Sequence, residues 1–338
     1  MQGKATWESP LIPVEPHQYY QAVYESMAAR RGFVFVRYYK ADGVTELMDY
    51  HDALPVSLGW EEHRISFVGR PGATFVRIGF SAFENKNDDL TGVRKVAVRP
   101  SGSEAFRQWA DGLLEALPPV RMSGDVVAVY QPDGWRELFD RGGTVKMALL
   151  GDSIINDMSN SLFQSRVEAL YPGLILQAYP VVRGSTGCWY YRHENRIRDR
   201  VMINQPDFLI IGGISHRNDI EAIRAVIHQA RGMKPGMPIL LLTGPFGFKK
   251  DADPRGDETW TLVLNPEGAS YRARLLALAV EEGADFFDLQ GAMGEYLLSH
   301  DRDYAEFQRD DVHANKWGAA VMAKLLEDYF TPNRTSNE

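Results

Sequence analysis

A serine with surroundings suited to nucleophilic chemistry lies near the middle of the chain. Val145–Leu150 is an apolar run of strand length, and Gly151-Asp152-Ser153 follows it directly, before a helical pattern. A serine at such a turn lies beside a helix N-terminus, where the helix dipole and unpaired backbone N–H groups favour a developing anion. The same position also suits an ordinary helix N-cap. Gly-Asp-Ser alone therefore leaves both interpretations open.

A serine nucleophile needs a base, and a second motif near the other end of the chain supplies one. Asp310 and His313 are three residues apart in a loop that follows the last predicted strand. The carboxylate can hold one nitrogen of the imidazole while the other accepts the serine proton. The alternative is a surface loop whose histidine has no chemical role.

The second part of the chain alternates strand and helix patterns, which predicts the scaffold for these residues. Strand-length apolar runs lie at Val145–Leu150, Leu174–Ala178, Phe208–Ile211, Ile239–Leu242 and Ala284–Leu289, with helical patterns at about 157–170, 192–204, 219–232, 267–282 and 317–330. Repeated βαβ units form a parallel sheet with helices on both faces, and ligands bind at the carboxyl ends of its strands. Residues 144–330 are therefore predicted to form a flavodoxin-like, three-layer α/β/α domain with a five-stranded parallel sheet.

The first part of the chain has a different pattern. Short β-branched and aromatic runs, such as 64–68 and 74–80, are separated by Gly, Pro, Asn and Asp clusters, which predicts strands and turns. We expect residues 1–120 to form a β-sandwich of jelly-roll type, with a helix over 104–116 near its end. Residues 121–143 are predicted to be a connector with a short helix near Trp135, and 331–338 a polar tail.

Composition excludes several classes of function. The 338 residues include 37 Lys and Arg against 45 Asp and Glu, a net charge of −8, so nucleic acid is not expected as the main partner. The single cysteine, Cys188, excludes an internal disulfide and cysteine-based zinc sites, and we expect neither metal nor cofactor. No apolar run is long enough to span a bilayer. No signal peptide is visible, so we expect a secreted or periplasmic protein if one has been removed and a cytoplasmic protein otherwise.

Taken together, Gly151-Asp152-Ser153 and Asp310-x-x-His313 on a five-stranded α/β pattern resemble the SGNH/GDSL hydrolase superfamily, over about residues 144–330. The resemblance implies a carboxylic ester hydrolase in which Ser153 is the nucleophile, His313 the base and Asp310 its acidic partner. Asp152 is expected beside the substrate, where its carboxylate binds backbone N–H groups and holds the turn. The resemblance implies no cofactor.

The resemblance also implies an oxyanion hole built from the Ser153 N–H and two loops. In Val182–Gly187 the matching residue is Gly187, with Gly184 as the weaker choice. The loop Gly212–Asp219 departs from the family's Gly-x-Asn-Asp pattern: the Asn-Asp pair selects Asn218, whereas counting from the strand start selects His216, and we favour Asn218 slightly. A turn glycine and a helix cap are the structural alternatives.

The substrate implied by the resemblance is an O-acetylated carbohydrate, because related hydrolases with a preceding β-rich domain often remove acetyl groups from polysaccharides. Trp189 and Tyr190 follow Gly187 and could line a sugar site, although such residues more often only pack. The loop 244–259 could cap the pocket. The alternatives are a lipase, thioesterase or arylesterase acting on small acyl esters, and an inactive carbohydrate-binding protein. The sequence leaves the oligomeric state open.

Overall fold

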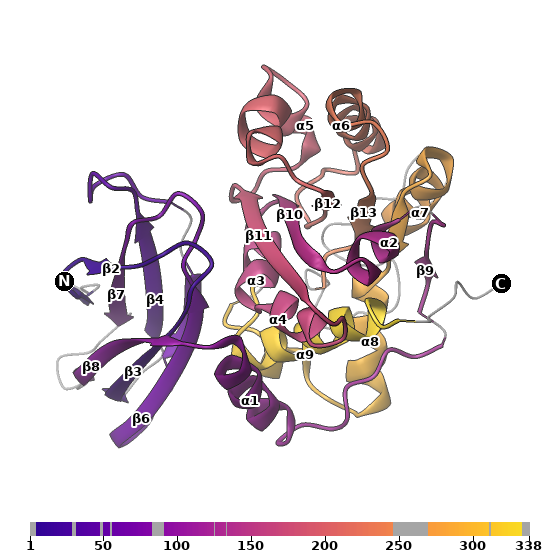
Figure 1. Cartoon of the computed structure of the whole chain (residues 1–338). Coiled ribbons are helices and arrows are strands. Elements are labelled where there is room, and N and C mark those ends of the chain that lie inside the picture. Colours follow the sequence, from indigo (N-terminus) through magenta and orange to yellow (C-terminus); the bar gives the residue numbers. More distant parts are fainter. Residues whose placement is uncertain are drawn as a thin grey trace. The chain divides into compact units, whose positions relative to one another are not determined.

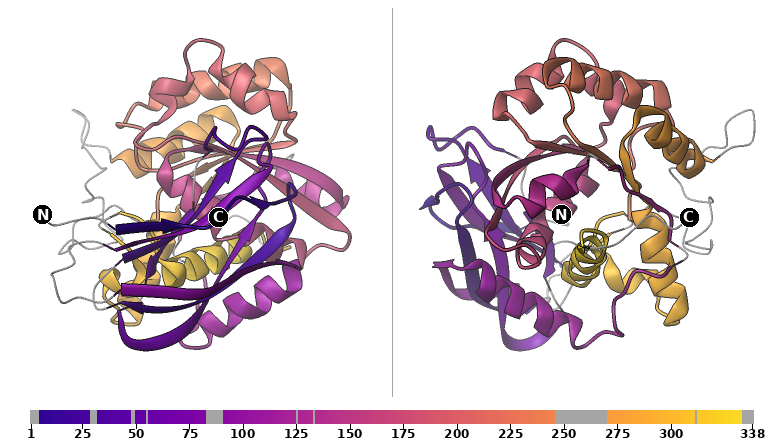
Figure 2. Two further views of the ribbon diagram at one scale, coloured as in Figure 1. Left: turned by 90° about the vertical axis from the view of Figure 1, so that its left-hand side faces the viewer. Right: turned by 45° about the vertical axis from the view of Figure 1, so that its right-hand side comes forward.

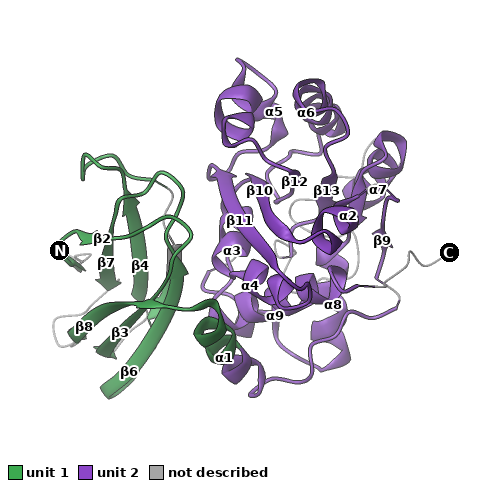
Figure 3. Ribbon diagram, viewed as in Figure 1, with its two compact units in different colours: residues 1–110 green, residues 111–338 purple. Residues whose placement is uncertain are grey.

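A computed structural model of the chain describes residues 5–28, 32–47, 50–54, 56–82, 91–124, 126–132, 134–245, 270–310 and 312–332. The chain is a mixed α/β protein with several sheets. It divides into two compact units, Met1–Ala110 and Asp111–Glu338, which are coloured separately in Figure 3. The sequence placed the end of the first domain at residue 120, whereas the units divide within a helix, α1 (Ser103–Leu114).

The first unit contains two antiparallel sheets, with strand orders β1-β7-β4-β5 (β2 pairs with β7) and β6-β3-β8. The strands are β1 (Ala5–Glu8), β2 (Ile12–Pro13), β3 (Tyr19–Ala28), β4 (Gly32–Tyr39), β5 (Tyr50–Leu54), β6 (Ser57–Val68), β7 (Phe75–Ala82) and β8 (Thr91–Ser101). Alternate residues of β3 are buried, as expected when one face of a sheet covers a core. A single hydrophobic core contains residues of both sheets: Tyr24 and Phe67 come from the sheet of β3 and β6, and Val36 and Ile78 come from the sheet of β4 and β7.

The second unit is built around one sheet of order β11-β10-β12-β13-β14-β9 (Figure 1). Its strands are β9 (Ala128–Val129), β10 (Gly143–Gly151), β11 (Leu174–Val182), β12 (Phe208–Ile211), β13 (Ile239–Leu242) and β14 (Asp285–Phe287). Strands β10 to β14 pair in parallel, and β9 pairs antiparallel with β14. The segment expected to be only a connector thus adds a sixth strand to the sheet.

Side chains of β10 alternate between two cores. Met147 and Leu149 join one core, and Ala148 and Leu150 join the other, because successive strand residues point to opposite faces. Helices cover both faces (Figures 1 and 2). On the first face lie α2 (Trp135–Asp140), α3 (Ser153–Asn160), α4 (Phe163–Glu168), α8 (Leu289–Ser299) and α9 (Lys316–Tyr329); on the second lie α5 (Cys188–Tyr191), α6 (Ile220–Met233) and α7 (Tyr271–Glu282).

Two of the predicted helices differ in the structure. The helix expected at 157–170 is two helices, α3 and α4, separated where Leu162 has a left-handed backbone with φ of +53°. The helix expected at 192–204 is instead a π-helical turn, η1 (Ile197–Val201), followed by a 3₁₀ turn, η2 (Met202–Asn204). Ile197 and Val201 are both buried, so the apolar spacing of this segment imitates that of an α-helix.

Candidate active site

The order of the parallel strands determines where a site can form. The chain runs through β10 at the centre, then to β11 on one side, and then to β12, β13 and β14 on the other. Connections after β10 and β12 therefore diverge to opposite faces of the sheet, and the carboxyl ends of these two neighbouring strands form the switch point at which such sheets bind ligands. Ser153 follows β10 and the loop Gly212–Asp219 follows β12. The candidate residues thus gather where a doubly wound sheet binds its ligands.

Asp152 joins the two segments that meet at this switch point. Its buried carboxylate caps α3 by accepting a hydrogen bond from the Ile154 N–H at 2.9 Å, and it accepts two more from the N–H groups of Ile214 and Ser215, both at 2.8 Å. Only 1% of Asp152 is exposed. The carboxylate faces backbone N–H groups, so Asp152 holds the framework of the site, and contact with the substrate stays a prediction for this residue.

The approach of the two loops requires glycine at Gly213. Its φ is +110°, and a Cβ at this position would lie 2.4 Å from Oδ1 of Asp152. A side chain here would collide with the carboxylate and strain the backbone. This glycine therefore permits the hydrogen bonds that join the loop Gly212–Asp219, called the β12 loop below, to the turn before Ser153.

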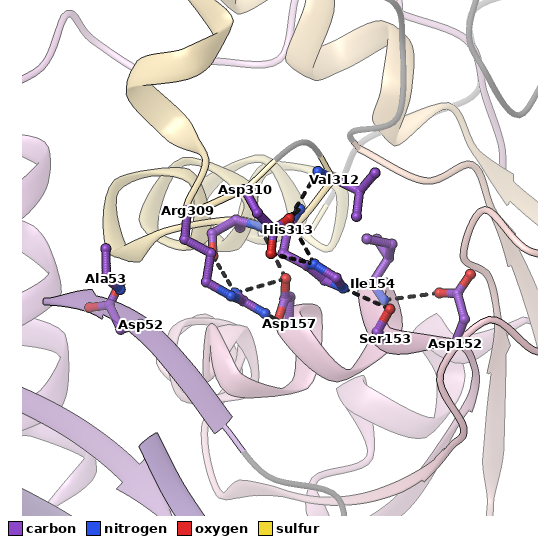
Figure 4. A network of polar contacts seen from close by, with 11 residues as sticks. Asp52, Ala53, Asp152, Ser153, Ile154, Asp157, Arg309, Asp310, Val312 and His313 are labelled. Atoms are coloured by element: carbon purple, nitrogen blue, oxygen red, sulfur yellow. Dashed lines mark hydrogen bonds and ion pairs between the residues drawn. The ribbon is translucent and has the colours of Figure 1, made fainter. Parts of the chain in front are cut away.

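The three residues of the two motifs form one chain of hydrogen bonds (Figure 4). Nε2 of His313 lies 2.8 Å from Oγ of Ser153, and Nδ1 of His313 lies 2.9 Å from both carboxylate oxygens of Asp310. Ser153 is partly exposed at the first position of α3. Two segments 160 residues apart thus place a hydroxyl, an imidazole and a carboxylate in the order that nucleophilic catalysis requires.

Asp310 is held as a carboxylate by its own loop. Burial alone would raise its pKa, but hydrogen bonds from the His313 side chain and from the backbone N–H groups of Val312 and His313 outweigh this effect and lower the pKa. Hydrogen bonds to the charged form favour ionisation. These hydrogen bonds favour the ionised form of Asp310, and its carboxylate can stabilise a proton on His313.

A buried ion pair, which the sequence motifs did not reveal, joins the histidine loop to the serine helix. Nη1 and Nη2 of Arg309 lie 3.1 and 3.0 Å from the two carboxylate oxygens of Asp157, and both side chains are almost fully buried. Asp157 belongs to α3 and also accepts a hydrogen bond from the Ala314 N–H at 3.1 Å. Figure 4 shows this pair beside His313. Its only signal in the sequence is proximity: Asp157 is one helical turn after Ser153, and Arg309 precedes Asp310.

His216 is committed to the framework of the β12 loop. Its ring is buried; Nε2 lies 2.9 Å from the Gly212 carbonyl oxygen, and Nδ1 accepts a hydrogen bond from the Cys188 N–H at 3.2 Å. Burial lowers the pKa of His216, so the ring is neutral, with its one proton on Nε2. That proton is directed to a carbonyl, which argues against His216 as the oxyanion donor.

Asn218, the other candidate in this loop, lies in a strained turn. It is half-buried, and it and its neighbour Arg217 both have left-handed backbones, with φ of +60° and +54°. Asparagine tolerates this conformation better than most residues other than glycine, whereas for Arg217 it is uncommon and carries a cost. The helix cap expected at this position belongs to Asp219, whose carboxylate accepts a hydrogen bond from the Ala222 N–H at 2.9 Å.

The β11 loop, residues 183–187, contains two glycines, and only Gly187 is required by its surroundings. A Cβ on Gly187 would lie 2.7 Å from both the Cα of His216 and the carbonyl oxygen of Ser215, whereas one on Gly184 would meet nothing within 4 Å. Gly187 also precedes α5 as its N-cap. The glycine lets the β11 loop lie directly against the β12 loop, as an oxyanion hole built from both loops requires.

Trp189 and Tyr190 are both half-buried and bound to their neighbours. Nε1 of Trp189 donates to the Ser215 carbonyl at 2.9 Å. The hydroxyl of Tyr190 accepts a hydrogen bond from Arg183 at 3.1 Å, and the Arg196 guanidinium lies 3.8 Å from the ring centroid. Trp189 therefore supports the β12 loop through its hydrogen bond to Ser215, and Tyr190 contacts the side chains of Arg183 and Arg196.

Among the residues that the structure describes, no group of three or more His, Cys, Asp or Glu side chains is arranged to hold a metal ion. Within the same part of the chain, no helix is both long enough and apolar enough to cross a bilayer. The loop 244–259, expected as a cap, lies outside the described residues from position 246 onward.

No model of a known protein family matches the sequence, and no curated protein matches it. Similar solved structures include a two-domain esterase active on acetylated mannans, with 16% identity, a TM-score of 0.44, and coverage of 60% of this chain and 53% of the esterase. An acetylxylan esterase mutant from Geobacillus stearothermophilus has 16% identity and a TM-score of 0.40, over 57% of this chain and 99% of its own. A peptidoglycan O-acetylesterase has 11% identity and a TM-score of 0.37, over 93% and 64%. The chain thus spans about half of the mannan esterase, and at these values the likenesses assign it neither a family nor an activity.

Proposed function

We propose that the chain is a serine esterase whose nucleophile is Ser153. The observation that carries this proposal is the hydrogen-bonded series Asp310–His313–Ser153, with 2.9 Å and 2.8 Å between successive partners. The serine is also partly exposed, at a helix N-terminus and at the switch point of the sheet. A helix cap alone would need neither the histidine nor the carboxylate.

The proposed reaction transfers an acyl group to water. Oγ of Ser153 attacks the ester carbonyl while His313 takes its proton, and Asp310 stabilises the imidazolium that forms. The tetrahedral intermediate then expels the alcohol, which takes the proton from His313, and leaves an acyl-serine. A water molecule then attacks the acyl-serine while His313 takes its proton. The second tetrahedral intermediate releases the acid and expels Oγ of Ser153, which takes the proton back from His313.

The oxyanion of each tetrahedral intermediate would be bound by the N–H groups of Ser153 and Gly187 and by the side-chain amide of Asn218. Gly187 and Asn218 belong to the two loops that lie against each other beside the serine. Because these donors are held before the substrate arrives, they stabilise the charge that develops without reorganisation. His216 is not included, since its ring already bonds to Gly212 and Cys188.

We infer that the acyl group is small and its carrier polar, most simply an O-acetylated carbohydrate. Trp189, Tyr190 and several arginines follow the Gly187 segment. Among the described residues, the strongly exposed large apolar side chains include none in the segments 151–153, 183–191 and 212–219, although Ile203, further along the connection from β11 to β12, is one. A long acyl chain would need such an apolar surface, so a lipase is the weaker alternative.

The test compares acyl length and substrate class in one series. We expect hydrolysis of 4-nitrophenyl acetate to exceed that of the octanoate, and acetate to be released from at least one member of a panel of acetylated polysaccharides. The Ser153→Ala variant is the control, with an expected loss of about 10⁴-fold or more in kcat. Preference for octanoate would favour the lipase alternative. No hydrolysis of any ester by the folded protein would contradict the proposal and favour an inactive binding protein.

A further inference from the structure

Among the residues that the structure describes, three arginines in the segments that follow β11 and β12 have no acidic partner. Arg183, Arg200 and Arg217 are exposed, and within the described part of the chain none of them is ion-paired with a carboxylate. Neighbouring arginines do have such partners: Arg196 pairs with Glu194, and Arg198 with Asp199. The whole protein carries a net charge of −8. Unpaired cations at this place are therefore a local feature and not a consequence of composition.

Aromatic rings fix the position of these guanidinium groups. Arg183 and Arg200 lie 4.8 and 5.9 Å from the ring centroid of Tyr190, and Arg183 also donates to its hydroxyl at 3.1 Å. Arg217 lies 3.9 Å from the ring centroid of Trp189. Stacking of this kind preorganises a planar guanidinium, so less side-chain entropy is lost when an anion binds. Gathering like charges is unfavourable by itself, and a bound anion would relieve it.

Two of the three arginines are joined directly to the segments that form the site. The backbone N–H of Arg183 donates to the Gly151 carbonyl at 3.1 Å, two residues before Ser153. Arg217 lies between His216 and Asn218 in the β12 loop and has a left-handed backbone. Their cations therefore belong to the same two loops that would bind the oxyanion.

We propose that Arg183 and Arg217, supported by Arg200, form a subsite for a carboxylate carried by the substrate, so that the preferred ester is an acylated acidic carbohydrate. This inference rests on the proposed esterase function. A planar guanidinium matches a carboxylate in a bidentate geometry, which an ammonium group cannot do. The subsite would place the charged sugar beside the ester that Ser153 attacks, and it would favour acidic over neutral substrates because only the acidic ones gain the ion pair.

The test uses one polymer in two charge states. O-acetylated polygalacturonate and the same polymer with its carboxyl groups methyl-esterified present the same acetyl groups, with and without neighbouring charge. We expect kcat/KM for acetate release to be about tenfold higher on the acidic polymer, and this advantage to fall as NaCl is raised, because exposed charges are screened. In Arg183→Gln/Arg217→Gln the ratio of the two kcat/KM values should approach one. Arg198→Gln, an exposed arginine paired with Asp199, is the matched control and should keep the wild-type ratio.

The outcomes separate this inference from the function on which it rests. Equal rates on the two polymers, together with normal hydrolysis of 4-nitrophenyl acetate, would overturn the subsite and leave the esterase intact. A ratio unchanged in the double arginine variant would also overturn it. Equal preference for a sulfated, acetylated polymer would overturn the assignment to carboxylates. Failure to hydrolyse 4-nitrophenyl acetate would instead contradict the esterase function itself.

Discussion

His216 and Asn218 differ in what the fold already requires of them. Both ring nitrogens of His216 bond to backbone groups, the Gly212 carbonyl and the Cys188 N–H. Asn218 lies two residues further along the same loop, with a left-handed backbone that asparagine tolerates well. The two residues therefore separate into one that supports the loop and one whose amide we propose to donate to the oxyanion.

We expect Asn218→Ala to lower kcat by about 10²-fold with little change in KM. The reason is that a donor to the oxyanion is used mainly in the transition state. Steady-state kinetics with 4-nitrophenyl acetate measure both constants. For His216→Ala the expected effect is on stability, at about 1–3 kcal/mol for each backbone group left buried without a partner, and urea unfolding measures it. A larger loss of kcat in His216→Ala than in Asn218→Ala, with the fold intact, would reverse these roles.

The side chains that could be found from sequence are those that lie in compact motifs. Ser153 is marked by its turn, and Asp310 and His313 by their spacing. Asp157 and Arg309 are 152 positions apart, and no local pattern connects them. The fold brings the two side chains together, and their burial indicates that the ion pair contributes to holding the site in place.

At the scale of elements, the site depends on keeping the loop 308–315 against α3. The Asp157–Arg309 pair crosses between these elements, and the N–H of Ala314 donates to the same carboxylate. A buried ion pair does not stabilise strongly compared with apolar residues, but loss of one partner leaves a charge in a poor environment. The ion pair therefore helps to keep His313 at hydrogen-bonding distance from Ser153.

We expect Arg309→Met to lower the free energy of unfolding by about 3–5 kcal/mol, because Asp157 is left buried and unpaired. It should also lower kcat more than it changes KM, since a small displacement of His313 disrupts proton transfer. Chemical unfolding and steady-state kinetics measure the two effects. The double variant Arg309→Met/Asp157→Asn should recover part of the stability and little of kcat. Full recovery of kcat together with stability would reduce the pair to a purely structural role.

A second element-scale prediction concerns Asp285, at the start of β14. Burial raises the pKa of this carboxyl to about 7, although the Gln131 N–H donates to it and Arg136 and Arg231 attract its charge. A raised pKa means that the folded state binds the proton more tightly than the unfolded state does. The protonated Asp285 therefore makes its full contribution to the free energy of unfolding at pH values below the pKa that this carboxyl has in the unfolded chain. That contribution is lost as the pH rises through about 7, the pKa in the folded state.

We expect Asp285→Asn to remove this dependence. Between about pH 4 and 7 the wild type should lose up to about 1.4 kcal/mol of stability per pH unit relative to the variant, and above pH 7 the variant should be the more stable protein. Urea unfolding at several pH values measures the difference. The exposed Asp301→Asn serves as the control and should follow the wild type. Parallel pH profiles for Asp285→Asn and the wild type would contradict the prediction.

The strands that the sequence predicted well include two short, continuously apolar runs that are buried on both faces of the sheet. The runs at Phe208–Ile211 and Ile239–Leu242 coincide with β12 and β13. β9 escaped detection because two residues carry no periodicity, and only its pairing with β14 defines it. The sequence predicts an α-helix over the π-helical turn Ile197–Val201, because its two buried residues are four positions apart, a spacing that is also typical of one face of an α-helix.

At the scale of the whole molecule, the two compact units have separate hydrophobic cores. The core of the first unit draws only on residues before the division, and both faces of the large sheet are covered within the second. Every residue of the proposed site belongs to the second unit. We propose that the first unit is an accessory module that binds carbohydrate, with Trp60, which is 40% exposed and stacked by Arg94 at 4.1 Å, as one contact.

We expect a fragment of residues 103–338, which keeps α1 whole, to fold and to hydrolyse 4-nitrophenyl acetate with a kcat close to that of the full chain. On an acetylated polysaccharide its KM should be higher, since polymer binding is assigned to the missing unit. Circular dichroism checks folding, and the small ester is the internal control. A folded fragment that has lost activity on the small ester would show that the first unit supplies part of the site.

The central claim is that Ser153 is the nucleophile, and the most direct test is the mass of the protein after treatment with a fluorophosphonate, followed by peptide mapping. Such reagents form a stable adduct only with a serine that an adjacent base activates. The account predicts one adduct per chain, on the peptide that contains Ser153, and none on Ser153→Ala. It also predicts slower labelling of His313→Asn. An adduct on another serine, or undiminished labelling of Ser153→Ala, would contradict the account.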